Sequence, residues 1–191
     1  MQAAPKLKTE RSTNLLMQNK KWISVFELAL FPMFAALMVA SKYVMEILPN
    51  IHLIGMFVML FTVVYRAKAL IIIYVFAGIM GLLNGFNVWW VPYLYIWTIL
   101  WAMTMLIPKK IPKWAGFVVY PIVCSLHGFL YGILYSPFQA LAFGYSFEQT
   151  LLWIASGFPF DIIHGISNFA MGFLVWPLSE VIKKAQKNLD R

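Results

Sequence analysis

Long apolar stretches alternate with short polar connections along most of this 191-residue chain. A transmembrane helix needs about 20 residues to cross the hydrocarbon core, and somewhat fewer where the bilayer thins. The pattern therefore predicts an all-α membrane protein with six transmembrane helices. We expect these helices at about residues 22–48, 52–65, 69–85, 88–107, 114–135 and 158–182.

Capping residues and helix breakers predict how the last transmembrane helix begins. Ser146, with Gln149 three residues later, has the form of a capping box. This signal predicts a short outer helix before the last span. Gly157 and Pro159 are expected to break or kink the chain after it, because Pro159 suits the first turn of the sixth helix.

The basic residues predict how these helices are oriented in the membrane. Fourteen of the fifteen Lys and Arg residues lie in four short polar patches, at residues 6–21, 66–68, 109–113 and 183–191. The connections that alternate with these patches carry no Lys or Arg, and they lie near residues 49–52, 84–92 and 136–148. Short basic loops stay on the cytoplasmic side of a bilayer. We therefore expect both termini in the cytoplasm and three connections outside.

The apolar stretches show no internal repeat, so one membrane domain explains the pattern. We expect a cytoplasmic basic segment at residues 1–21, a six-helix transmembrane domain at 22–182 and a cytoplasmic basic tail at 183–191. The first twenty residues are polar and mixed in charge, and they do not resemble a signal peptide.

Composition excludes several classes of protein. A chain with 62% hydrophobic and 12% charged residues does not suit a soluble domain. The net charge of +8 comes from basic residues beside apolar spans, where the lipid bilayer attracts them, so we expect no nucleic-acid partner. The single cysteine, Cys124, excludes an internal disulfide and a multi-cysteine metal site, and we expect no metal and no cofactor. The chain contains no GxxxxGK[ST] loop, so it does not hydrolyse ATP by the P-loop route.

Polar side chains within the expected membrane region gather in its outer half. Such groups are costly in a membrane, so each one needs a reason. They are Lys42 and Glu46 in the first helix, Asn50, His52, Asn84 and Asn87 in the outer connections, His127 in the fifth helix, and Asp161, His164 and Asn168 in the sixth. An ion channel would need polar groups along the whole depth. The pattern predicts instead a substrate-binding site that opens to the outside.

Three of these residues share one face of the last helix. Asp161, His164 and Asn168 are spaced at i, i+3 and i+7, and we expect them to face His127. This arrangement favours a ligand site. Asp161 could instead complement the N-terminal end of its own helix. His164 and Asn168 could instead form hydrogen bonds with a neighbouring helix.

The other candidates for the site also have two interpretations. Trp90, Tyr93 and Trp97 share a helix face and could form the wall of a pocket, or they could belong to an aromatic belt at the interface. Lys42 and Glu46 are spaced at i, i+4 and could bind a ligand. They could equally form a structural ion pair, or Lys42 could extend to the lipid headgroups.

Small residues at four-residue spacing predict close contacts between helices. Ala36 and Ala40 have this spacing in the first helix, and Gly128 and Gly132 have it in the fifth. Such pairs let another helix approach closely.

The chain resembles the substrate-binding S components of energy-coupling factor (ECF) vitamin transporters over about residues 26–182. The resemblance depends on size, on six expected spans, and on the segments at residues 29–40, 48–53 and 157–169. The first of these segments is similar to the family's first helix, whose AxxxA motif docks on the transmembrane T component. Ala36 and Ala40 fit that motif.

The resemblance implies a mechanism that composition does not supply. An S component binds a vitamin or related micronutrient in an outward-facing pocket, then associates with a T component and two cytoplasmic ATPases. The protein would then be a multi-pass protein of the bacterial cell membrane. The segments at residues 48–53 and 157–169 resemble a subgroup of this family that is similar to the cobalamin type, so cobalamin is the first substrate expected. Riboflavin, pantothenate, a folate, a pyridoxine-like vitamin and a queuosine precursor stay open.

Three other classes of protein remain as alternatives. An intramembrane enzyme could use the histidines and Asp161 for acid–base chemistry. However, the chain has no GxSxG, HExxH or paired acidic metal motif, and we do not expect an enzyme. A haem-binding protein could use His127 and His164 as axial ligands. A scaffold subunit would bind partners and no small molecule.

Overall fold

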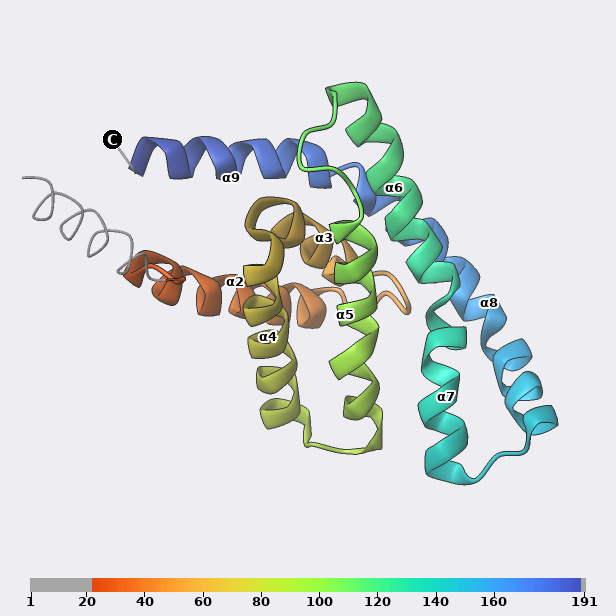
Figure 1. Cartoon of the computed structure of the whole chain (residues 1–191). Coiled ribbons are helices and arrows are strands. Elements are labelled where there is room, and N and C mark those ends of the chain that lie inside the picture. The colour runs from red at the N-terminus through yellow and green to blue at the C-terminus, as the bar shows by residue number, and fades with distance from the viewer. Residues whose placement is uncertain (1–21, 190–191) are drawn as a thin grey trace, which may run out of the picture. The chain divides into compact units, whose positions relative to one another are not determined.

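The computed structural model describes residues 22–189, and the expected basic segment 1–21 lies outside this range (Figure 1). The chain divides into two compact units, Met1–Leu30 and Phe31–Arg191, and each is described by itself. In the first unit a capping box starts α2, Val25–Val44. The Ser24 N–H donates to Glu27 Oε2 at 2.8 Å, and the Glu27 N–H donates to Ser24 Oγ at 3.1 Å.

The larger unit contains the rest of α2 and the remaining helices of the described chain. In order, these are α3 (Ile54–Tyr65), the 3-10 helix η1 (Arg66–Lys68), α4 (Ala69–Asn84), the 3-10 helix η2 (Val88–Trp90), α5 (Val91–Met105), α6 (Lys113–Phe129), α7 (Tyr131–Phe143), α8 (Phe147–Gly172) and α9 (Val175–Leu189). No strand occurs within residues 22–189. The predicted all-α class is confirmed for this part of the chain.

Three stretches of the described chain are long and apolar enough to cross a membrane, namely Val25–Val44, Ile54–Asn84 and Lys113–Phe143. A fourth is obtained if α8 and α9, which bend by 44° at their junction, form one span. The six separate spans and the cytoplasmic position of the termini stay predictions. One reason is the length of the single helices. α3, α4 and α5 have 12, 16 and 15 residues, and a straight span needs about 20.

The prediction of a short outer helix is wrong, although the predicted start of that helix is confirmed. The Gln149 N–H donates to Ser146 Oγ at 3.2 Å, and the Ser146 N–H donates to Gln149 Oε1 at 2.8 Å, so the capping box is present. The helix then runs without a break through Gly157 and Pro159 to Gly172. A proline removes one helical hydrogen bond. Apolar surroundings favour keeping the other backbone groups paired within the helix.

The expected sixth span is instead divided between α8 and α9. α9 is amphipathic, with Val175 and Ser179 buried and Lys184 and Lys187 exposed. Amphipathic helices with a basic polar face commonly lie along a membrane interface. The residues between about 158 and 182 therefore do not form one straight helix.

The middle of the larger unit is α3, in which every residue from Ile54 to Thr62 is buried. α3 contacts α4, α5, α6, α8 and α9. Thr62 is the polar residue in this run, and its hydroxyl donates to the Val58 carbonyl at 2.6 Å. Because that bond stays within the helix, α3 can be enclosed on all sides without an unpaired hydroxyl.

A sharp turn at Arg66 joins α3 and α4 and attaches them to α5. Arg66 has a φ of 55°, which is uncommon for a residue other than glycine. Its guanidinium donates to the Met105 carbonyl at 2.7 Å and the Ile107 carbonyl at 3.3 Å. The Trp101 indole N–H donates to the Arg66 carbonyl at 3.1 Å. The positive charge therefore lies at the C-terminal end of α5, where the helix dipole favours it.

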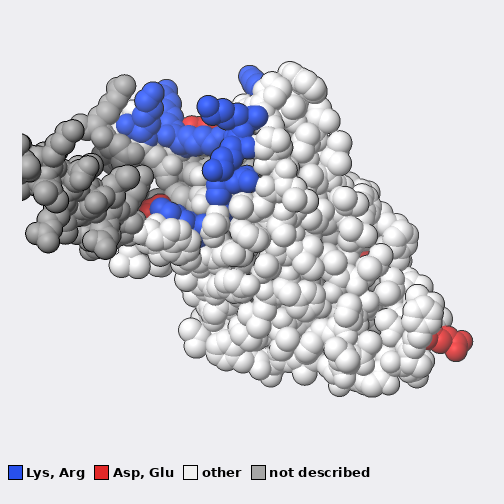
Figure 2. Space-filling view, in the orientation of Figure 1, with Lys and Arg blue, Asp and Glu red and all other residues white. Residues whose placement is uncertain are grey.

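The connections that carry basic residues lie at one end of the helices. In Figure 1 the α3–α4 and α5–α6 connections are at the end near α9, while the α4–α5 and α7–α8 connections are at the opposite end. Figure 2 shows Lys and Arg side chains gathered near α9, and most of the visible face is free of charged residues. These two basic and two non-basic connections lie at opposite ends, as the basic patches predicted, and the side of the membrane on which each end lies stays a prediction.

Glycines allow α8 to approach α6 at backbone distance, as their spacing predicted. A Cβ on Gly128 would lie 2.9 Å from the Gly165 Cα, and a Cβ on Gly165 would lie 2.5 Å from the Phe129 ring. A Cβ on Gly172 would lie 2.5 Å from the Pro121 Cα. Real Cβ atoms do not approach neighbours this closely, so these positions require glycine.

We predict that Gly128→Ala destabilises the protein by about 1–3 kcal/mol, because an added methyl group meets backbone atoms that cannot move aside. The measurement is the thermal unfolding midpoint of the purified protein in detergent. Gly157→Ala is the matched control in α8, since nothing lies within 4 Å of the position that its added methyl group would take. It should be neutral or stabilise by up to about 1 kcal/mol. Equal midpoints for both variants would contradict the close packing.

Candidate functional site

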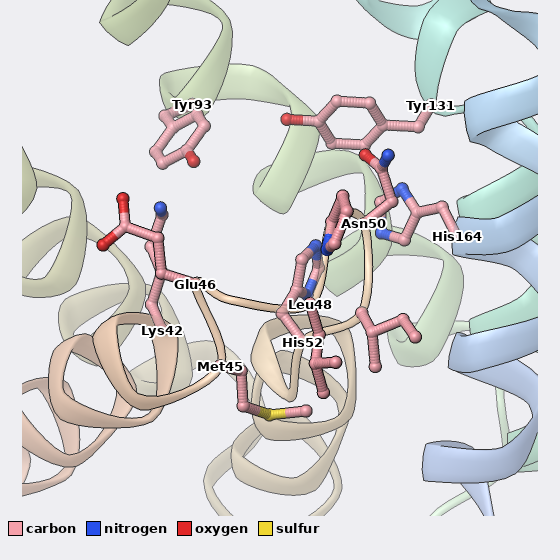
Figure 3. A pocket seen from close by; sticks show the side chains of 11 residues that line it. Lys42, Met45, Glu46, Leu48, Asn50, His52, Tyr93, Tyr131 and His164 are labelled. Carbon is pink, nitrogen blue, oxygen red and sulfur yellow. The ribbon is translucent and has the colours of Figure 1, made fainter.

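A polar cavity of about 230 Å³ lies beside the end of α2 (Figure 3). The end of α2 and its connection to α3 form one side, and side chains from α5, α7 and α8 form the rest. The sequence-predicted residues in its wall are Lys42, Glu46, Asn50, His52, Tyr93 and His164. The other lining residues are Tyr131, Met45, Leu48, Pro49 and Ile51.

A β-turn shapes the connection between α2 and α3. The Ile51 N–H donates to the Leu48 carbonyl at 3.1 Å, and Pro49 and Asn50 occupy the two central positions. Asn50 has a φ of 60°. Proline followed by asparagine with positive φ suits a type II turn. This turn brings Asn50 and His52 into the wall of the cavity.

Aromatic rings pack in a continuous cluster at the inner side of the cavity. The His164 ring lies 4.6 Å from His52 and 4.9 Å from Tyr131, measured between ring centroids. Trp97 lies behind them, 6.2 Å from His52, 5.8 Å from His127 and 6.1 Å from Tyr131. Such ring contacts fix the orientation of the cavity wall.

Several nitrogen atoms in this cluster are buried without a hydrogen-bond partner among the described residues. They are His52 Nδ1, His164 Nε2, His127 Nδ1 and Trp97 Nε1. The other His127 ring nitrogen, Nε2, lies 3.1 Å from the Ile96 carbonyl. Buried polar atoms are usually paired, so each unpaired one needs an explanation. His52 and His164 line the cavity, so a polar group inside it could satisfy both.

The three residues predicted to form one stripe on the last helix have different surroundings. Asp161, His164 and Asn168 all lie on the buried face of α8, as their spacing predicted. Of these, His164 lines the cavity. The Asn168 amide donates to the Cys124 carbonyl at 3.3 Å. Asn168 therefore joins α8 to α6 instead of facing the cavity.

Asp161 caps a neighbouring helix. The Gly132 N–H, in the first turn of α7, lies 3.2 Å from Asp161 Oδ1 and 3.1 Å from Asp161 Oδ2. The first N–H groups of a helix have no partner within it, and a carboxylate there is favoured by the helix dipole. The alternative that Asp161 complements the N-terminus of its own helix is wrong, because α8 begins at Phe147. A ligand contact by Asp161 stays untested.

The remaining sequence-predicted candidates lie outside the cavity wall. The Trp90 indole donates to the Ala77 carbonyl at 2.7 Å, and the Asn84 amide donates to the Tyr43 hydroxyl at 2.8 Å. Asn87 is exposed. Trp97 and His127 are buried behind the lining residues. Their roles as ligand contacts stay predictions.

Sequence reasoning missed Tyr131. It lies four residues after His127, close to the break between α6 and α7 at Leu130, and its ring contacts both His127 and His164. The aromatic spacing after His127 was the available signal.

The cavity wall offers a ligand hydrogen-bonding atoms, aromatic rings for stacking, and two charged groups for pairing. Lys42 and Glu46 form no ion pair with each other in the described structure, although they are four residues apart. Within residues 22–189, no group of three or more His, Cys, Asp or Glu side chains is placed to hold a metal ion.

Comparison of the chain with protein-family models, curated proteins and solved structures found no match.

We predict that Asp161→Ala lowers stability by about 0.5–2 kcal/mol, because it removes the cap of α7. Asp161→Asn keeps one carbonyl oxygen as an acceptor and should lose less. The check is the thermal unfolding midpoint of each purified variant. A midpoint equal to the wild type for Asp161→Ala would mean that the cap contributes nothing.

Proposed function

We propose that the protein is the substrate-capture (S) subunit of an ECF-type ABC importer in a bacterial cell membrane. It would bind a vitamin or related micronutrient in a cavity open to the outside. It would then deliver the ligand through a transmembrane T component driven by two cytoplasmic ATPase subunits. The observation that carries this proposal is a polar cavity in an apolar helical protein, with unpaired nitrogens of His52 and His164 in its wall.

The position of the cavity supports capture rather than conduction. Its lining comes from the end of α2, the α2–α3 connection, the first turns of α5 and α7, and α8. The middle of the larger unit is filled by the buried residues of α3. A cavity on one side of an apolar core suits a protein that holds a ligand and needs partners to release it.

The exposed face of α2 supports docking to a partner. Ala36 and Ala40 are exposed, and the neighbouring Met33 and Leu37 on the same side are 65% and 49% exposed. Small residues on an open helix face let another transmembrane helix approach closely. In this proposal that helix belongs to the T component.

The size of the cavity favours a small ligand. Ligand pockets commonly have volumes of about 300–1,000 Å³, and this cavity has about 230 Å³. Cobalamin, the first substrate that the family resemblance suggested, would have to keep most of its corrin ring outside. The smaller vitamins suit this cavity better.

We predict that gently purified protein carries a small molecule, which mass spectrometry of the released fraction identifies. Adding that molecule at 100 times its Kd should stabilise the wild type by about 2.7 kcal/mol. His164→Phe should abolish this shift, because it keeps a ring but removes the unpaired nitrogen. Glu148→Ala, which changes an exposed residue outside the cavity, should keep it. A full shift in His164→Phe would contradict the site.

We predict that Ala36→Trp and Ala40→Trp abolish ligand uptake and leave ligand binding intact. A large ring on this face would prevent close docking of the partner helix. Leu82→Trp is the control, because Leu82 is 75% exposed on α4. Uptake is measured in cells that express the T component and ATPases, and binding is measured on purified protein. Normal uptake by both alanine variants would rule out docking through this face.

A further inference from the structure

Two opposite charges lie in the wall of the cavity without a partner. Lys42 and Glu46 both line it, and neither side chain has a hydrogen bond or ion pair within the described structure. Elsewhere in the described chain, Lys183 and Glu180 form an ion pair at 2.9 Å. Charges beside a membrane core are costly unless they are paired or reach water.

The end of α2 explains why the two charges do not pair. The helix ends at Val44, and the Glu46 N–H donates to the Tyr43 carbonyl in a tighter turn. Glu46 therefore leaves the helical register that would place it beside Lys42. Figure 3 shows both side chains extending from this end of α2 in the direction of Tyr93.

The rest of the wall contributes no further carboxylate, ammonium or guanidinium group. Its other polar residues are Asn50, Tyr93, Tyr131, His52 and His164. The cavity therefore offers one ammonium group, one carboxylate group, and a set of rings with hydrogen-bonding atoms. A ligand that matches all of them carries a negative group, a positive group and a planar ring.

We propose that the cavity selects a small zwitterion with an aromatic or heteroaromatic ring. The ligand's carboxylate pairs with Lys42, its ammonium group pairs with Glu46, and its ring packs against His52, Tyr131 and His164. The volume of about 230 Å³ suits a molecule of this size. This inference rests on the proposed capture function and names the class of substrate.

Charge matching gives the selectivity that this proposal requires. A zwitterion pairs both wall charges and brings no net charge into the site. A ligand with a single charge leaves either Lys42 or Glu46 unpaired in a partly desolvated place, which disfavours it. We expect each such analogue to bind at least about tenfold more weakly than the zwitterion.

The test uses four aromatic zwitterions as probes on the full-length protein in lipid nanodiscs. These are phenylalanine, tyrosine, tryptophan and histidine, each compared with its decarboxylated amine and its deaminated acid. The measurement is the Kd from calorimetric or thermal-shift titration. At least one amino acid should bind, and both of its singly charged analogues should bind at least about tenfold more weakly.

Two substitutions assign the charges to the residues. Lys42→Met should weaken binding of the zwitterion and of the acid, and it should strengthen binding of the amine, because no unpaired Lys42 charge remains. Glu46→Gln should weaken binding of the zwitterion and of the amine, and it should strengthen binding of the acid, because no unpaired Glu46 charge remains. Lys109→Met and Glu148→Gln make the same changes at exposed residues that do not line the cavity. They should leave all affinities unchanged.

Three outcomes would overturn the inference: no amino acid binds up to millimolar concentration, the singly charged analogues bind as well as the zwitterion, or the two substitutions weaken all probes equally. The proposed capture function is tested separately by the molecule that co-purifies with the protein. If the bound molecule lacks the negative or the positive group, the zwitterion proposal is wrong and the proposed capture function is not affected. If no small molecule binds at all, both proposals fail.

Discussion

The contact between α8 and the α6–α7 pair is the constraint on which the site depends. Gly128 and Gly165 let the two backbones approach, and Asp161 then reaches the unpaired N–H of Gly132 at the start of α7. The same contact fixes the rotation of α8 about its axis. His164, three residues after Asp161, is therefore directed toward His52 and Tyr131. A small shift of α8 would separate these rings and open or close the cavity.

Much of the local structure could be predicted from the sequence, because it depends on neighbouring residues. The all-α class, the capping box at Ser146 and the close approach at Gly128 follow from short patterns. The buried face of α8 also follows from the spacing of its polar residues. These patterns show which residues share one face of a helix, and that depends only on the spacing of the residues along the chain.

The assembly of the site could not be predicted in the same way. Asp161 and Asn168 share a face with His164, yet one caps α7 and the other binds the Cys124 carbonyl. Those partners come from another helix, and their identity depends on the exact position where the helices cross. The break near Leu130 was also missed, although Gly128 and Gly132, which weaken a helix, lie on both sides of it. This break places Tyr131 at the start of α7, in the wall of the cavity.

The most direct measurement is the accessibility of the cavity in intact cells that express the protein. The buried Cys124 is replaced by alanine, and single cysteines are introduced as Leu48→Cys in the cavity wall and Lys109→Cys in a basic connection. An outward-facing capture site predicts that a membrane-impermeant maleimide labels the first without permeabilisation and the second only after it. It also predicts that bound ligand protects Leu48→Cys. Labelling of Leu48→Cys only after permeabilisation would contradict an outward-facing cavity.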